Sequence, residues 1–122
     1  MLMLISIVPI TNGSIIKDDD IDISISAGLF GFDIGNGIKI KIKNFENSDF
    51  IAYINITYDS VFGNKIDRSN RNYSILPDSE WATYILIGPR ALFNQVEISV
   101  EVGDAFAGRE GFSIGSFLIL YK

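Results

Sequence analysis

Three aspartates alternate near the start of the chain, at Asp18, Asp20 and Asp22. In an extended segment every second side chain points the same way, so their carboxylates would share one side about 7 Å apart. Calcium binds through several hard oxygen ligands of this kind, which makes the trio a candidate metal site. The segment lacks the glycine and the final glutamate of the known calcium loop. We therefore favour the alternative, a solvated boundary of the domain.

Three asparagines stand in the pattern Asn-x-Ser/Thr that accepts N-linked sugar, namely Asn12, Asn55 and Asn72. Three such sites are somewhat more than chance would give, which favours an exported protein. Asn55 is the best candidate, because the residues around it place it on the polar face of a strand.

Three lysines alternate with isoleucines at Lys39, Lys41 and Lys43. On one face of a strand they would form a stripe that suits an acidic polymer. The simpler interpretation is a solvated sheet face, on which the lysines pair across strands with residues such as Asp22. Each such pair contributes about 0.2–1 kcal/mol, and lysines on a strand also discourage aggregation between sheet edges.

Four aromatic residues would together make a sugar-stacking platform: Trp81, Tyr53, Tyr73 and Tyr84. Trp81 begins a strand directly after a turn, where aromatic side chains usually pack over the end of a sandwich. We therefore expect Trp81 to pack at the core or its rim.

Catalytic groups are scarce. Asp104, Arg109 and Glu110 would lie in one loop, yet nothing in their spacing specifies a substrate geometry. The chain contains no histidine and no cysteine, so it lacks the commonest general base, the commonest transition-metal ligand and any thiol nucleophile. We expect no enzyme activity and no cofactor, calcium apart.

The net charge of -5 would repel nucleic acid, so we expect protein partners or self-association.

The elements that position these residues are strands. From Ile38 to Lys43 apolar and charged residues alternate without a slip, which puts three isoleucines on one side of an extended strand and three lysines on the other. A helix would scatter them around its circumference. Similar alternation predicts strands at Ile21–Leu29, Phe50–Asp59, Val61–Ile66, Tyr73–Leu76, Trp81–Ile87, Val96–Val102 and Phe112–Tyr121.

Turn signals separate these strands. Asn36-Gly37 predicts a tight turn into the lysine strand, and polar loops are predicted at Asp67–Asn72 and Gly103–Gly111. Seven or eight short strands without a convincing helix predict an all-β fold, a sandwich of two antiparallel sheets. A small closed barrel is the alternative.

The first ten residues, MLMLISIVPI, are almost wholly apolar. They resemble the apolar part of a secretory signal, although a basic leader and an Ala-x-Ala cleavage site are lacking. Alternatively they form a first strand of the domain or a strand that inserts into a neighbouring subunit. We divide the chain into residues 1–17, leader and charged boundary, and residues 18–122, the sandwich domain. No stretch approaches the roughly 20 apolar residues of a membrane-spanning helix.

The order of the signals resembles the immunoglobulin-like modules of microbial cell-surface proteins, of the CARDB-like or fibronectin-type-III-like kind. The resemblance covers roughly the C-terminal two-thirds of the chain. It rests on Ile-x-Ile-x-Ile-Lys-Asn at 38–44, Asn55-Ile56-Thr57, the turn Leu76-Pro77-Asp78-Ser79-Glu80, the strand Val96–Val102 and the ending Gly111-Phe112-Ser113-Ile114-Gly115-Ser116-Phe117. It implies an immunoglobulin-like sandwich without catalytic residues. Such modules commonly sit in long multidomain chains.

Three functions therefore compete. The first is a non-catalytic, extracellular module for cell-surface structure, adhesion or assembly, and it is the one we favour. The second is a filament subunit that polymerises by donating its N-terminal strand to the next molecule. The third is a small calcium- or carbohydrate-binding module.

Overall fold

The computed structural model describes residues 14–17, 20–30, 32–62, 66–88 and 93–122, and these residues contain strands but no helix. Accordingly, no helix within these ranges is long and apolar enough to cross a membrane. The strands are β1 (Ser14–Lys17), β2 (Ile21–Ala27), β3 (Ile34–Gly35), β4 (Gly37–Asn44), β5 (Phe50–Ser60), β6 (Ile66–Ile75), β7 (Ser79–Leu86), β8 (Phe93–Val102), β9 (Ala105–Ile114) and β10 (Phe117–Leu120).

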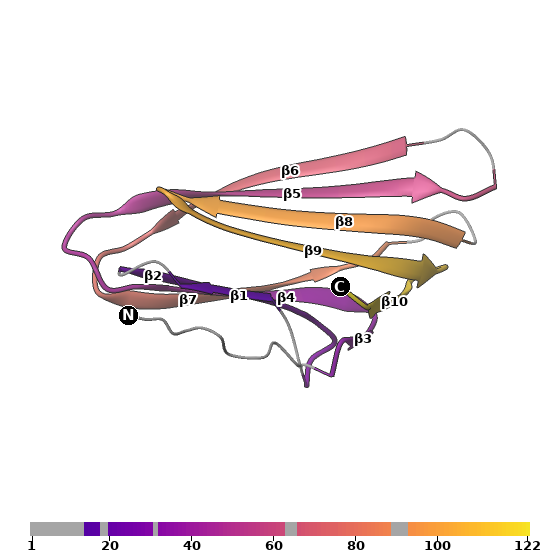
Figure 1. The fold of residues 1–122 in the computed structure, drawn as a ribbon, viewed down its shortest axis with the longest axis horizontal. Coiled ribbons are helices and arrows are strands. Elements are labelled where there is room, and N and C mark those ends of the chain that lie inside the picture. The colour runs from indigo at the N-terminus through magenta and orange to yellow at the C-terminus, as the bar shows by residue number, and fades with distance from the viewer. Residues whose placement is uncertain (1–13, 18–19, 31, 63–65, 89–92) are drawn as a thin grey trace.

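The strands form two sheets that face each other (Figure 1). One sheet has four strands in the order β1-β2-β4-β7, and the other has six in the order β3-β10-β9-β8-β5-β6. Every pairing is antiparallel. The predicted all-β architecture of two antiparallel sheets is confirmed.

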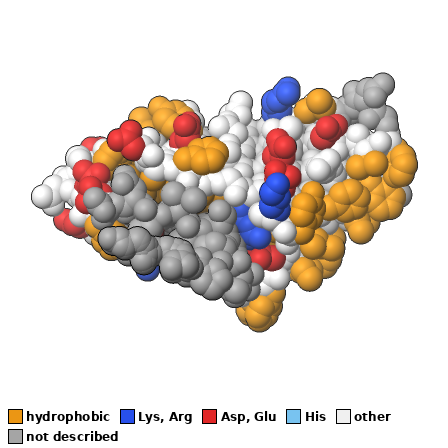
Figure 2. All heavy atoms as spheres, viewed as in Figure 1, with side chains coloured by type: hydrophobic (Ala, Val, Ile, Leu, Met, Phe, Trp, Pro, Cys, Tyr) orange, Lys and Arg blue, Asp and Glu red, His pale blue; other side chains and the backbone are white. Residues whose placement is uncertain are grey.

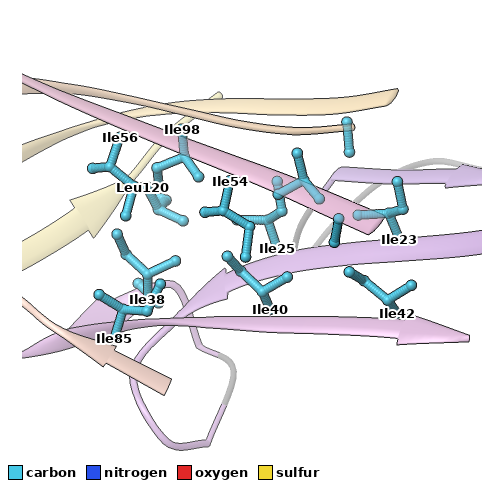
Figure 3. Packing of buried hydrophobic residues seen from close by; sticks show 14 of the residues in the cluster. Ile23, Ile25, Ile38, Ile40, Ile42, Ile54, Ile56, Ile85, Ile98 and Leu120 are labelled. Carbon is cyan, nitrogen blue, oxygen red and sulfur yellow. The ribbon is translucent and has the colours of Figure 1, made fainter. Parts of the chain in front are cut away.

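Alternation of apolar and polar side chains places the core between the sheets. Ile38, Ile40 and Ile42 of β4 are fully buried, while Lys43 is exposed on the opposite face. In the six-stranded sheet β5 and β8 alternate in the same way. Figure 3 shows the side chains of the two layers meeting, with Ile54, Ile56 and Ile98 on one side and the β4 isoleucines on the other. The predicted orientation of the lysine strand is therefore confirmed.

Two stretches differ from the prediction. The polar residues 67–72 belong to β6, not to a loop, and no strand covers Val61 or Phe62. β6 is an edge strand that pairs along ten residues with β5 and diverges from β7 (Figure 1). Because little of the other sheet covers it, most of its side chains are at least partly exposed. Without one buried face the strand carries no alternating pattern.

The second difference is at 103–111, where a loop was predicted and β9 is found. The hairpin turn between β8 and β9 is confined to Gly103 and Asp104, and Gly103 adopts a positive φ of 58°. The inward side chains of β9 include Ala105 and Ala107, which are small and therefore give a weak hydrophobic signal. A second tight turn at Gly115-Ser116 leads into β10, so the stretch Phe112–Tyr121, predicted as one strand, is divided between β9 and β10.

The N-terminal part is described from Ser14. Residues 14–17, which fall in the predicted leader and boundary segment 1–17, pair with β2 as the edge strand β1. The predicted apolar leader, residues 1–10, lies outside the described residues.

Candidate functional site

The candidate calcium ligands are only partly within the described chain, because Asp18 lies outside it. Asp20 precedes β2, and its carbonyl accepts a hydrogen bond of 2.8 Å from Phe45 N. Asp22 lies in β2 opposite Lys43, and its Oδ1 is buried without a hydrogen bond from any described residue. In the part of the chain that the structure describes, no three acidic side chains gather in a cluster that would hold a metal ion.

Two of the three predicted sequons are described, and both asparagines are exposed on the outer face of the six-stranded sheet. Asn55 lies in the middle of β5, between Asn70 of β6 and Ser99 of β8. Asn72 lies in the edge strand β6, opposite the outward-facing Tyr53. Asn12 lies outside the described residues.

The lysines of β4 have partners across the strands. Lys41 Nζ lies 3.7 Å from Glu80 Oε2 of β7, and Lys39 Nζ donates to the carbonyl of Leu29 at 3.5 Å. Lys43 lies opposite Asp22 on one side and Glu80 on the other. These contacts favour the interpretation as a solvated sheet face, because Lys41 and Lys43 have acidic neighbours and Lys39 donates to a backbone carbonyl.

The four aromatic residues do not form one platform. Trp81 and Tyr73 lie with their ring centres 4.7 Å apart, and both pack against the core. Tyr53 is exposed on the outer face of β5, and the Tyr84 hydroxyl donates to Asn36 Oδ1 at 2.7 Å. The prediction that Trp81 packs at the core is confirmed.

The residues Asp104, Arg109 and Glu110 are also separated. Asp104 lies in the β8–β9 turn, whereas Arg109 and Glu110 point to opposite faces of β9. Arg109 is buried between the sheets, and its Nη1 donates to Asp33 Oδ1 at 2.8 Å. This is a structural ion pair and not part of an acid/base set.

The Arg109–Asp33 pair ties several parts of the fold together. Arg109 also donates to the carbonyl of Ile25 in β2 at 3.2 Å and to that of Lys122 at 3.0 Å. Asp33 has a positive φ of 65°, and its backbone N–H donates to the Ala27 carbonyl at 3.1 Å. One buried guanidinium therefore joins the two sheets, the β2–β3 connection and the C-terminal end. If β9 is recognised as a strand, its alternation predicts that Arg109 points inward. No pattern in the sequence predicts that Asp33 is its partner.

This ion pair fixes the base of an apolar loop. We define the apolar loop as Leu29, Phe30 and Phe32, whose side chains are 63%, 83% and 74% exposed. Gly28, at its start, has a positive φ of 79° and leaves no room for a Cβ beside the Ile34 carbonyl. Its N–H donates to the Gly37 carbonyl at 2.9 Å. The loop is thus anchored at both ends while its large apolar side chains face solvent.

A second apolar surface lies beside this loop, at one end of the outer face of the six-stranded sheet. Figure 2 shows hydrophobic side chains gathered there, at the right of the view. We define the apolar belt as Ile34, Val61, Phe62, Phe93, Phe112, Ile114, Phe117 and Ile119.

Ring contacts and strand pairing make the belt continuous. The ring of Phe93 lies 5.6 Å from that of Phe62, edge on, and 5.8 Å from that of Phe112, stacked. Ile114 pairs with Phe93 on one side and with Phe117 on the other. The pairing of Ile119 with Ile34 then extends the belt to β3, which directly follows the apolar loop.

The middle of the same sheet face is polar, and it separates the belt from Ile51, Tyr53 and Phe106, which are exposed near the other end of the sheet. Away from the belt, β8 presents Glu97, Ser99 and Glu101 outward, and β5 presents Asn55 and Thr57. The belt itself contains no charged residue. Sequence reasoning missed this surface, because its members come from five different segments of the chain. Chemically it can bury apolar groups but cannot transfer a proton or hold a metal.

Comparison of the chain with protein-family models, with curated proteins and with solved structures finds no match in any of the three.

Proposed function

We propose that this chain is a non-catalytic, immunoglobulin-like module that works outside the cell in surface structure, adhesion or assembly. The observation that carries the proposal is the apolar belt, an aromatic surface without charge that is held on a hydrogen-bonded sheet. Monomeric proteins rarely leave so much contiguous apolar surface in water unless it meets a partner. The absence of histidine and cysteine from the whole chain supports a binding role over a catalytic one.

The strand order supports the immunoglobulin-like part of the proposal. Immunoglobulin domains pack strands A, B and E in one sheet against C, F and G in the other. Here β2-β4-β7 take the order of A-B-E, and β5-β8-β9 take the order of C-F-G. β6 extends the second sheet beside β5, as strand C′ does in variable-type domains. β1, β3 and β10 are additions to this plan.

The extracellular location rests on the apolar N-terminal stretch and the sequons. Its test is fractionation of the source cells combined with protease treatment of intact cells. We expect the protein in the envelope or medium fraction, and we expect external protease to remove it without breaking the cells. Recovery of the intact protein only from the cytosol would refute the proposed location and function.

A second candidate, the filament subunit that donates its N-terminal strand, is favoured by one feature. β6 pairs with β5 on one side and, among the described residues, with no strand on its other side. Its ten residues contain no proline, so this edge would accept an added strand. Deleting residues 1–10 leaves β1 intact and should abolish polymerisation while the far-ultraviolet dichroism stays unchanged. Undiminished polymerisation of the deletion variant would end this candidate.

A further inference from the structure

The exposed apolar surface formed by the belt and the loop is large. The apolar loop and the five most exposed belt residues (Ile34, Val61, Phe62, Ile114 and Phe117) have exposed fractions between 43% and 83%. At about 200 Å² for each large apolar side chain, they expose roughly 1,000 Å² together. The largest apolar patch on a typical monomer is about 300–600 Å². One partner in a standard protein interface buries about 800 Å². The surface therefore has the size of one side of a stable interface.

The exposed apolar surface is also uncharged. None of the eleven residues of the belt and the loop is charged. Two copies of the chain each carry a net charge of -5, yet contact through this surface would bring no like charges directly together. Interfaces between identical subunits are the more apolar class, and their cores are enriched in aromatic residues. Six of the eleven members are phenylalanines.

The backbone that carries this surface is held in place by the fold. Strand pairing holds most belt residues on a sheet, and the Arg109–Asp33 pair fixes the base of the loop. Because this backbone is already ordered, little conformational freedom would be lost on contact, and more of the free energy of apolar burial would appear as binding affinity.

We infer that a second copy of this chain covers the belt and the apolar loop, and that the two copies are related by a two-fold axis. In such an interface each copy contributes the same surface. The inference rests on the proposed function as an assembly module, and it names the partner.

The test is sedimentation equilibrium of the full chain over a wide concentration range, with variants matched in residue type and exposure. Phe117→Ser removes a belt ring that is 47% exposed. Phe106→Ser removes a ring that is 50% exposed on the same sheet face but near the opposite end of β9, where it faces Glu101. Phe62→Ser is a second belt variant from a different segment. Dichroism and urea unfolding establish that each variant is folded.

We expect the wild-type chain and Phe106→Ser to dimerise alike. Both belt variants should raise the dissociation constant at least tenfold, which equals about 1.4 kcal/mol of binding free energy. Equal weakening by Phe106→Ser, or no weakening by either belt variant, would overturn the inference.

A wild-type chain that remains a monomer at every concentration would also overturn it, and would point to residues 1–10 or to a different protein as the occupant. If such a monomer is found at the cell surface, the proposed function is supported although the proposed interface is wrong. If a dimer is found only in the cytosol, the proposed interface is supported although the proposed function is wrong.

Discussion

Replacing Arg109 with methionine should lower the free energy of unfolding by about 3–5 kcal/mol, the usual cost of removing one partner from a buried ion pair. The side chains of Arg109 and Asp33 are only 7% and 12% exposed, so water cannot replace the lost guanidinium well. The Ile25 and Lys122 carbonyls lose a donor at the same time. Methionine fills much of the volume of the arginine stem. The loss in free energy of unfolding therefore measures the missing polar contacts more than the effect of a cavity.

The expected loss is large against the total. Domains of this size unfold with about 5–15 kcal/mol, so Arg109→Met should remove at least about a fifth of the stability. The double variant Arg109→Met/Asp33→Gly separates the causes. Glycine tolerates the positive φ of Asp33 and removes the unpaired carboxylate, so the double variant should recover at least about 1 kcal/mol relative to Arg109→Met alone.

Urea unfolding followed by tryptophan fluorescence measures these differences, because Trp81 packs against the core. The transition midpoint should fall while the slope of unfolding free energy against urea stays constant. A loss below about 1 kcal/mol for Arg109→Met would refute the reasoning, since a buried carboxylate cannot lose its cation so cheaply. A double variant as unstable as the sum of the two single variants would refute it as well.

Two further predictions concern connections between strands. Gly28→Ala should cost about 2 kcal/mol or more in urea unfolding, because the new Cβ meets the Ile34 carbonyl at a positive φ, whereas Gly88→Ala has open space and should cost little; equal effects would contradict this. Asn44 is buried and makes three side-chain hydrogen bonds to the backbone of the β4–β5 and β6–β7 connections, so Asn44→Ala should cost about 2–3 kcal/mol. The exposed Asn55→Ala should stay within about 0.5 kcal/mol, and a similar loss in both variants would show that the Asn44 contacts contribute nothing specific.

The sequence predicted the fold where one face of a strand is buried. In β4 and β8 the side chains alternate because one face meets the other sheet, so inspection of Ile38–Lys43 and Val96–Val102 identified both strands. The same logic failed for β6, which lies at a sheet edge and has polar residues on both faces. It failed for β9 because Ala105 and Ala107 are too small to mark an inward face.

The candidate surface was beyond the reach of sequence reasoning. Phe62, Phe93 and Phe117 belong to separate segments, and only the pairing of β5, β8, β9 and β10 brings them together. The Asp33–Arg109 pair spans 76 positions in sequence and depends on the packing of the two sheets. By contrast, the sequence named Asp22 as a neighbour of the lysines, and it lies opposite Lys43 because β2 and β4 pair across a short connection.

Cross-linking measures whether two copies of the chain meet at the belt. The chain has no cysteine, so single introduced thiols report one position each. Ser116→Cys places a thiol in the exposed turn beside Phe117, and Asp104→Cys places one in the exposed turn at the opposite end of β9. With a short bis-maleimide at a concentration where the chain is dimeric, Ser116→Cys should give covalent dimers and Asp104→Cys should not. Equal cross-linking at both positions, or cross-linking only at position 104, would contradict the proposed interface.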